Sequence, residues 1–188
     1  NGSIFTVDVL KPVRGHSGFD ADFRDWGGCY WWQNTRLPYW AMLYSGDHGL
    51  MHPLFDMYLN ALPLAQYRSK KYYQHEGAMY PETMYFWGTW NNENYGWERE
   101  GKPDGLSDNM YIRYEWQGAI ELVAMMLDYY EFTEDINFLR NTLQPFAHEI
   151  LTFYDLHYQR NDDGKLRIEP AQALETYWEG TINPMPEI

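Results

Sequence analysis

The chain has 188 residues, a formal net charge of −13 and 19% aromatic residues, and its apolar share of 45% excludes a disordered chain. The negative charge argues against nucleic acid and against an anionic membrane surface as partners, because no Lys or Arg cluster could match their charge. Tyr and Trp rings with polar tips suit a wet cleft, so the composition favours a neutral ligand such as a saccharide.

The first part of the chain changes from strand-like to aromatic residues. Residues 3–10 alternate partly and are rich in β-branched residues, which predicts a short strand, and a second short strand is expected at 166–170. Residues 11–25 hold Pro, Gly and several charges, which is typical of a loop. The aromatic run 26–40 follows, and a helical pattern begins inside it at Thr35.

A long helix is predicted between Asp47 and about Lys71, where apolar residues keep helical spacing. Asp47 is a suitable N-cap, but Pro53 would then lie in the second turn of the helix. The helix therefore either starts near His52, with Pro53 at its first position, or is kinked at Pro53.

A long loop and two further helices are predicted next. Residues 77–105 lack helical periodicity and are dense in Trp, Tyr and Asn, so we expect a functional loop rather than a disordered one. One helix is predicted from Tyr111 to Tyr130, with a broad apolar face. Thr133–Asp135 would cap the next helix, which runs to about Tyr158 and bends at Pro145.

Residues 165–178 combine carboxyl, aromatic and amide side chains. Burial among rings can raise the pKa of a carboxyl group, and a carboxyl that is protonated near neutral pH can act as a general acid. Aromatic faces and amides also suit a sugar ring. The alternative is a surface loop whose glutamates are solvated. The side chains concerned are Glu169, Gln172, Glu175, Tyr177 and Trp178.

The chain offers little for thiol or metal chemistry. Cys29 is the single cysteine, so no internal disulfide can form, and its aromatic surroundings are more typical of a small buried residue than of a nucleophile. His48 and His52 are four residues apart, but the Glu of an H-E-x-x-H motif and a third ligand are missing. We therefore expect no metal and no cofactor.

Three stretches together resemble a known family: 26–40 (WGGCYWWQNTRLPYW), 116–138 (WQGAIELVAMMLDYYEFTEDINF) and 163–178 (DGKLRIEPAQALETYW). In this order and spacing they are similar to the catalytic domain of glycoside hydrolase family 95, the inverting α-L-fucosidases and their relatives. The resemblance implies a mainly α fold that forms part of an (α/α)6 toroid, the six-hairpin glycosidase fold, with short β-strands in its loops.

The same resemblance suggests how the chain is organised. Residues 1–25 are expected to form an N-terminal loop and strand segment, and residues 26–188 to form helical hairpins and cleft loops. Since a full toroid needs more helices, we expect residues 1–188 to be a partial catalytic domain whose partner is the remainder of that domain.

The resemblance also implies catalytic residues. Glu175 matches the general-acid glutamate of the family, and Asn34 matches one of the two asparagines that hold its catalytic base. The second asparagine falls at Trp32, or at Gln33 if the gap is shifted. The family's base is an aspartate further along the chain that no part of this sequence matches, so the base is expected outside these residues.

We expect the other site residues to bind a substrate through ring faces, amides and carboxylates. Glu82, Asn92 and Glu93 are candidates for bonds to sugar hydroxyls. The candidate substrate-binding residues are Trp31, Trp32, Gln33, Trp87, Trp90, Asn92, Glu93, Gln172, Tyr177 and Trp178.

The predicted function is hydrolysis of an oligosaccharide or glycoside by an inverting general acid and base mechanism. One alternative is a non-catalytic carbohydrate-binding domain, because a fold does not fix a function. Another is a phosphorylase or lyase on the same helical toroid, although the arginines that could form a phosphate pocket are scattered along the sequence. From the resemblance we expect an extracellular or periplasmic location.

Overall fold

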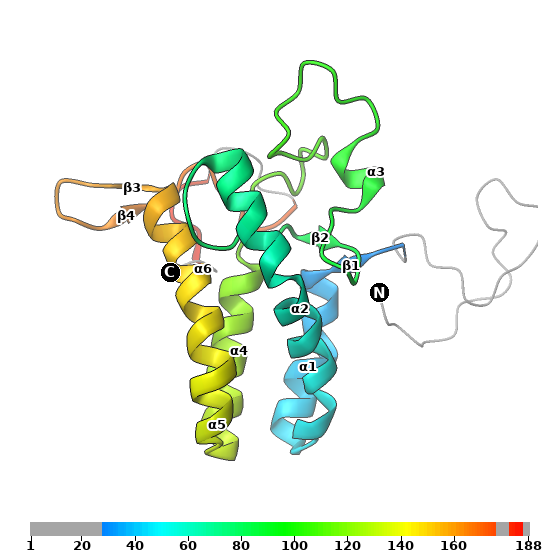
Figure 1. Cartoon of the computed structure of the whole chain (residues 1–188), viewed down its shortest axis with the longest axis vertical. Coiled ribbons are helices and arrows are strands. Elements are labelled where there is room, and N and C mark those ends of the chain that lie inside the picture. The colour runs from blue at the N-terminus through cyan, green and yellow to red at the C-terminus, as the bar shows by residue number, and fades with distance from the viewer. Residues whose placement is uncertain (1–27, 176–180, 186–188) are drawn as a thin grey trace, which may run out of the picture.

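The computed structural model describes residues 28–175 and 181–185. The strand expected at 3–10 lies outside these residues, as do the candidate site residues Tyr177 and Trp178. The described part of the chain is mainly helical, as expected from the sequence. Four long helices lie side by side, and the loops and short strands gather at one end of them, which we call the loop end (Figure 1).

The first helical hairpin consists of α1 (Trp32–Ser45) and α2 (His52–Arg68), joined by a 3₁₀ helix at His48–Leu50. α1 begins at Trp32 rather than at Thr35, because Glu82 supplies acceptors for its first N–H groups. The Trp32 N–H donates to the Glu82 carbonyl at 3.0 Å, and the Gln33 N–H donates to Glu82 Oε1 at 2.9 Å. α1 ends where Gly46 adopts a left-handed conformation with φ 83°.

The second helix of this hairpin follows one of the two alternatives that the sequence left open. α2 begins at His52, and Pro53 lies in its first turn, where a missing N–H costs no hydrogen bond. Asp47 does not cap α2, because it lies before the 3₁₀ helix and its carboxylate accepts a bond from the Ser45 hydroxyl at 2.6 Å. Beyond Arg68 the chain continues in a π-helical turn, Ser69–Tyr73.

The second hairpin consists of α4 (Gly118–Thr133), the short α5 (Ile136–Phe138), a π-helical turn (Leu139–Leu143) and α6 (Gln144–His157). The expected cap is confirmed, because Asp135 Oδ1 accepts the N–H groups of Asn137 at 2.9 Å and Phe138 at 3.1 Å. The helical path from α5 to α6 is continuous, and the π-helical turn ends just before Pro145.

The start predicted for α4 is wrong. Residues 111–117 form turns, and the helix begins only at Gly118. The helix starts late because the side chain of Gln172, which is distant in the sequence, forms hydrogen bonds with the backbone of this segment. Its Oε1 accepts the Tyr114 N–H at 2.6 Å, and its Nε2 donates to the carbonyls of Met110 at 2.9 Å and Tyr111 at 3.0 Å. Backbone groups that Gln172 occupies are not available for helical bonds.

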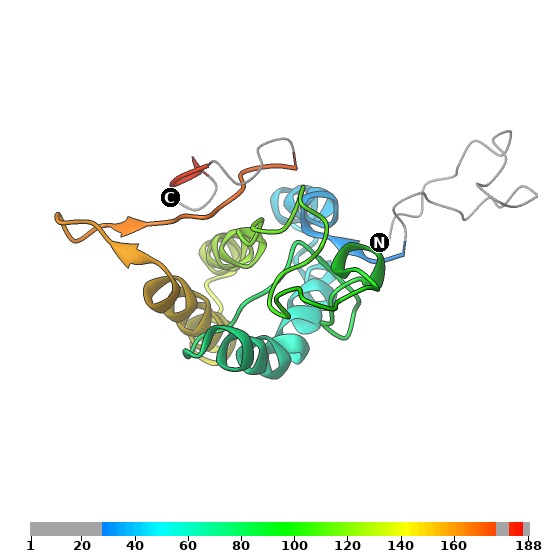
Figure 2. The ribbon, with the colours of Figure 1, turned by 90° about the horizontal axis from the view of Figure 1, so that it is seen from above.

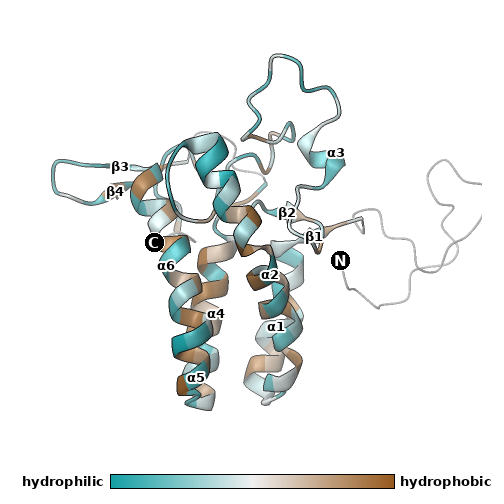
Figure 3. Cartoon of the chain, in the orientation of Figure 1, coloured by the Kyte–Doolittle hydropathy of each residue, from teal (hydrophilic) through white to brown (hydrophobic). Residues whose placement is uncertain are grey.

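The core lies between the helices, and α4 contacts both α1 and α6 while α2 packs on α6 (Figure 2). Hydrophobic residues concentrate on the helices, whereas the loops are mostly hydrophilic (Figure 3). At the top of the α1–α4 contact, a Cβ on Gly118 would lie 2.8 Å from the Trp32 ring, so the absence of a side chain sets how closely these helices approach. The largest side chains buried in the core are Trp32, Tyr58, Phe55, Phe146 and Phe153.

Two short antiparallel ladders complete the described structure. β1 (Tyr30–Trp31) pairs with β2 (Thr83–Met84), which ties the start of α1 to the loop that follows α2. β3 (Gln159–Arg160) pairs with β4 (Leu166–Arg167), so the strand expected at 166–170 is present in shorter form. The long segment 77–105 holds β2 and the single-turn helix α3 (Asn92–Tyr95), and is otherwise non-helical as expected.

Large apolar side chains remain exposed on the sides of the helices that face away from this core. They include Leu37, Tyr44, Leu127 and Phe132, and the rings of Tyr44 and Phe132 contact each other edge to face. Leu37 and Tyr44 lie on α1, and Leu127 and Phe132 lie on α4, so both helices carry apolar surface outside the core.

Candidate active site

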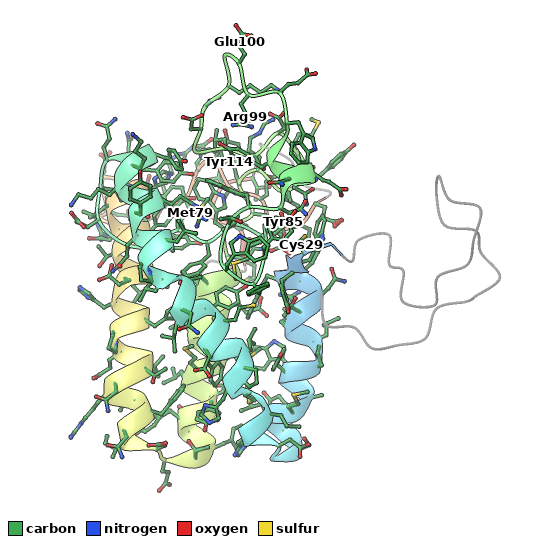
Figure 4. The ribbon with its side chains drawn as sticks, turned by 45° about the vertical axis from the view of Figure 1, so that its right-hand side comes forward. Cys29, Met79, Tyr85, Arg99, Glu100 and Tyr114 are labelled. Carbon is green, nitrogen blue, oxygen red and sulfur yellow. The ribbon has the colours of Figure 1, made fainter. Side chains whose placement is uncertain are left out.

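The candidate site lies at the loop end, where α1 and α4 both begin. Figure 4 shows that Cys29, Tyr85 and Tyr114, from three separate loop segments, all lie at this end. The β1–β2 ladder brings the start of α1 to Glu82, and the loop after β4 brings Glu175 to the same helix end. Gln33 Nε2 donates to Glu175 Oε1 at 2.6 Å, so two of the expected site residues meet although they are 142 positions apart.

The loop that carries Glu175 is fixed by Gln172. This side chain is fully buried, and besides its contacts with residues 110–114 its own N–H donates to the Tyr114 carbonyl at 3.2 Å. All three side-chain bonds of Gln172 therefore go to the backbone. The expectation that Gln172 binds substrate is corrected, because a buried amide with these partners holds the loop and does not face a ligand.

Two buried glutamates, both near Arg36 of α1, are the strongest electrostatic feature of the site. Glu82 is 2% exposed and Glu115 is 0% exposed. Gln117 Nε2 donates to Glu115 Oε1 at 3.1 Å, while Glu82 Oε1 accepts the Gln33 N–H. The second carboxyl oxygen of each glutamate is buried without a hydrogen-bond partner in the described part of the chain.

Burial changes the protonation of both groups. It raises the pKa of Glu115 from 4.5 to about 7, and the nearby charge of Glu175 adds to the shift. Burial also raises the pKa of Glu82 well above its ordinary value, with the charge of Glu115 as the next cause. The hydrogen bond from the Gln33 N–H and the charge of Arg36 lower the pKa of Glu82, but their effect is smaller than that of burial and Glu115. A protonated carboxyl at neutral pH is therefore present close to the candidate acid.

Trp32 proves to be a core residue. It is 1% exposed, packs edge to face on Tyr58, and its Nε1 donates to Glu121 Oε2 at 2.9 Å. Glu121 also accepts a bond from Trp40 Nε1 at 3.2 Å and forms an ion pair with Arg36. The expectation that Trp32 stacks on a substrate is corrected, because its ring is buried between Tyr58 and Gly118.

Asn34 follows Gln33 in the chain and Trp31 precedes Trp32, but the two residues differ in their surroundings. Asn34 is exposed in the first turn of α1, at the same helix end as Glu175. Trp31 precedes the helix and is 8% exposed, because it packs with Cys29 and Ile112 in a small second cluster. Of the two, Asn34 is the one that a ligand can reach.

The remaining candidates lie in the segment that runs from β2 through α3. Trp87 is 51% exposed and stacks on Tyr85 with ring centroids 4.6 Å apart. Trp90 is partly buried, with the Arg68 guanidinium 4.4 Å from its ring centroid. Asn92 and Glu93 are exposed on α3. Trp87, Asn92 and Glu93 are therefore accessible, whereas Trp90 mainly covers Arg68.

A separate hollow of about 480 Å³ opens next to the site, between the ends of α2 and α6. Tyr114 and Trp116, the neighbours of Glu115 in the sequence, line it together with His157. Burial lowers the pKa of His157 to about 4, and His75, whose ring nitrogen lies 3.0 Å away, adds to the effect. The imidazole is therefore uncharged at neutral pH.

In the part of the chain that the structure describes, neither a metal-binding cluster nor a membrane-spanning helix is found. Within residues 28–175 and 181–185, no three His, Cys, Asp or Glu side chains gather as metal ligands. Burial raises the pKa of Cys29 to about 11, which leaves its thiol unsuited to act as a nucleophile. None of the helices described for this chain is long and apolar enough to cross a bilayer.

Reasoning from the sequence missed Glu115 and underestimated Glu82. The signal for Glu115 was available, because it stands between Tyr114 and Trp116, just as Glu175 stands near Tyr177 and Trp178. The signal for Glu82 was weaker. It follows Ala78–Pro81, a buried and mostly apolar run, but its role at the start of α1 depends on a ladder between distant residues.

A comparison with family models shows the family of the chain. The model described as glycosyl hydrolase family 95 catalytic domain matches residues 21–182, which is most of the chain and includes α1, α4, α6 and Glu175. No curated protein matches the chain.

Proposed function

The chain belongs to glycosyl hydrolase family 95, and from this premise we propose that it cleaves a glycosidic bond by single displacement with Glu175 as the general acid. The observation that supports this role is the 2.6 Å bond from Gln33 to Glu175. It holds the glutamate that matches the family's acid at the start of α1, next to the exposed Asn34.

The proposed chemistry uses one proton from Glu175. The carboxyl group gives this proton to the glycosidic oxygen as the bond to the sugar breaks, and a base across the cleft removes a proton from the attacking water. In inverting enzymes the two carboxyl groups are about 6.5–9.5 Å apart, which leaves room for the water. Asn34 would help to hold the water or the base on the opposite side from the leaving group.

Substrate identity is a finer proposal. The resemblance favours an α-L-fucoside, so this glycoside is the first to test. The second asparagine of the family falls at Trp32, which here is buried and bonded to Glu121. Because the buried ring cannot replace an asparagine side chain in the cleft, other glycosides belong in the same substrate panel.

The test compares Glu175→Gln with the wild type in the intact enzyme. The amide keeps the shape of the side chain but cannot donate the proton that a poor leaving group needs. We expect hydrolysis of a natural glycoside to fall by about 10²–10⁴-fold, while an activated aryl glycoside, whose leaving group needs little protonation, is affected much less. Binding of the sugar, measured by calorimetry, should remain.

Glu169→Gln is the matched control, because Glu169 lies in the same loop but is exposed and accepts a bond from Arg167 at 2.7 Å. We expect it to retain activity on both substrates. Equal loss on both substrates in Glu175→Gln would indicate a binding or structural role for Glu175. No loss would assign the acid elsewhere, with Glu115 as the first alternative. Sugar binding without hydrolysis by the wild type would favour a non-catalytic carbohydrate-binding domain.

A further inference from the structure

The hollow between the ends of α2 and α6 has no part in the role proposed for Glu175. It measures about 480 Å³, which is within the size range of small-molecule binding sites. Within the described part of the chain, neither Gln33 nor Glu175 lines it, so it is a second place where a ligand could bind. The lining rings are Tyr72, Tyr73, Tyr114, Trp116 and His157.

One wall of the hollow, residues 103–106, is held in place by side chains that bond all four of its carbonyls. Arg99, at the loop end (Figure 4), donates to the first and last of these carbonyls at 2.5 and 2.8 Å. The Tyr95 hydroxyl donates to the second at 2.9 Å, and the Tyr73 hydroxyl donates to the third at 2.6 Å. A wall fixed in this way loses little conformational entropy when a ligand binds.

A second wall is fixed by packing and by Gln172. The Gln172 side chain accepts the Tyr114 N–H at 2.6 Å. Trp116 belongs to the core, and its ring centroid lies 5.7 Å from that of Tyr73 and 5.3 Å from that of His157. Trp116 is only 3% exposed, whereas Tyr73, Tyr114 and His157 are partly exposed. The hollow is therefore preformed and keeps accessible ring surface.

Hydrogen bonds determine which nitrogen of His157 can accept a bond from a ligand. His75 Nδ1 lies 2.7 Å from the Glu76 carbonyl, which can only accept, so this nitrogen carries a proton. In an uncharged pair, His75 Nε2 then accepts the proton of His157 Nδ1 at 3.0 Å. His157 Nε2 keeps a lone pair, and it has no hydrogen-bond partner within residues 28–175 and 181–185. It can accept a bond from a hydroxyl group.

The other polar groups of the lining complete a set of donors and acceptors. The Tyr72 hydroxyl and the Lys71 ammonium can donate, and the Asp104 carboxylate can accept. None of these three groups has a hydrogen-bond partner in the described ranges of the chain. The lining carries one positive and one negative charge, which favours an uncharged ligand. Hydroxyl groups both donate and accept, and aromatic side chains suit the apolar face of a ring.

We propose that this hollow is a second saccharide-binding site, which takes one neutral sugar ring. The sugar packs against the partly exposed aromatic side chains, and its hydroxyls bond Lys71, Asp104 and His157. The proposal goes beyond the role of Glu175 and does not depend on it, because the hollow has its own lining and binding there involves no bond cleavage.

The test observes the His157 ring directly by nitrogen NMR of the intact protein with labelled histidine, near neutral pH. The probes are D-galactose, L-fucose and D-glucose, which have no glycosidic bond to cleave. The Nε2 signal of His157 should have the shift of an unprotonated ring nitrogen and should move saturably with at least one sugar. The ring of His48, on the 3₁₀ helix between α1 and α2, should not respond. A His157 signal that no sugar moves would overturn the proposal.

Variants of the lining test whether the response comes from the hollow. Asp104→Ala and Tyr72→Ala should each raise the dissociation constant by about 3–10-fold, the effect expected for one lost hydrogen bond. Tyr67→Ala is the matched control for the ring, because Tyr67 lies on α2 and is 60% exposed outside the hollow. Equal effects of Tyr72→Ala and Tyr67→Ala, or unchanged binding in Asp104→Ala, would contradict the site. Circular dichroism checks the fold, and Asp104, which is exposed, provides the test if Tyr72→Ala unfolds.

The remaining comparisons test the class of ligand and separate the two sites. Sorbitol has hydroxyls but no ring, so an equal response to sorbitol would overturn recognition of a sugar ring. Tighter binding of glucuronate than of the neutral sugars would overturn the neutral class. The response should be the same in Glu175→Gln, and its loss there would place the sugar at the candidate active site instead. If Glu175→Gln leaves hydrolysis unchanged while the His157 signal still responds, the proposed function fails and the second site remains.

Discussion

At the scale of single residues, Arg68 stabilises the loop end from beneath. It is 3% exposed, and its guanidinium donates to the carbonyls of Met79 at 2.8 Å and Gly88 at 2.7 Å while lying over the Trp90 ring. Burial lowers the pKa of Arg68 to about 10, so it remains charged at neutral pH. One side chain thus anchors two points of the segment that carries Glu82.

Arg68→Met should lower the free energy of unfolding by about 2–4 kcal/mol. The reason is that two buried carbonyls lose their donors, at about 1–3 kcal/mol each, and the contact between the cation and the ring is lost. Lys70→Met is the control, because its pair with Glu76 is 72% exposed on both sides and should contribute less than about 1 kcal/mol. Urea unfolding measures both, and equal effects would contradict the role of Arg68.

Some residues of the candidate site could be selected from the sequence and others could not. Glu175 and Gln33 were selected in advance, and the structure places them in contact. Arg68 could not be selected, because its two carbonyl partners lie 11 and 20 positions along the chain in a segment without periodicity. Trp32 was misjudged because an aromatic run does not reveal which of its rings are covered.

At the scale of elements, the contact between α1 and α4 depends on a glycine. Gly118 begins α4, and a Cβ there would lie 2.8 Å from Cγ and 3.0 Å from Cβ of Trp32. The Trp32 indole cannot move aside freely, because its Nε1 bonds Glu121 on α4 itself. The spacing of the two helices therefore sets the position of Gln33, which follows Trp32.

Gly118→Ala should destabilise the protein by about 1–3 kcal/mol, since an added methyl group in a packed contact forces side chains or helices apart. Gly49→Ala is the matched control, because a Cβ there meets nothing within 4 Å. Urea unfolding of both variants checks this difference. A Gly118→Ala protein as stable as the Gly49→Ala protein would mean that the contact yields easily.

Element boundaries were predictable where the signal was local. Pro53 indicated the observed start of α2 as one of two alternatives, and Asp135 marked the start of α5, because a missing N–H and a capping carboxylate act on adjacent residues. The start of α4 was not predictable, since Gln172 occupies the backbone of residues 110–114 from 58 or more positions away. Similarly, α1 starts earlier than predicted because Glu82 accepts hydrogen bonds from the first N–H groups of this helix.

At the scale of the whole molecule, the buried Glu115 and the half-buried His157 make stability depend on pH in opposite directions. The pKa of Glu115 is raised from 4.5 to about 7, so its contribution to stability is present below pH 4.5 and is lost as pH rises through 7. The pKa of His157 is lowered from 6.5 to about 4, so its contribution is present above pH 6.5 and is lost as pH falls through 4.

His157→Gln should therefore remove a stabilising slope between pH 4 and 6.5 of at most about 1.4 kcal/mol per pH unit. Glu115→Gln should remove a slope of the opposite sign between pH 4.5 and 7. Free energies of unfolding measured across this range for each variant test both signs. His148→Gln, an exposed change on α6, is the control, and a His157→Gln protein with the pH dependence of the wild type would contradict the assignment.

The 142 positions that separate Gln33 from Glu175 also bear on how the protein folds. The two helical hairpins are local structures, whereas the entropy lost in closing a loop grows with its length. We therefore expect both hairpins to assemble before the segment with Glu175 docks on α1. Glu82 would already contact the start of α1 at that stage, so the proposed acid would arrive at the site after it. Helical structure would then recover ahead of activity during refolding.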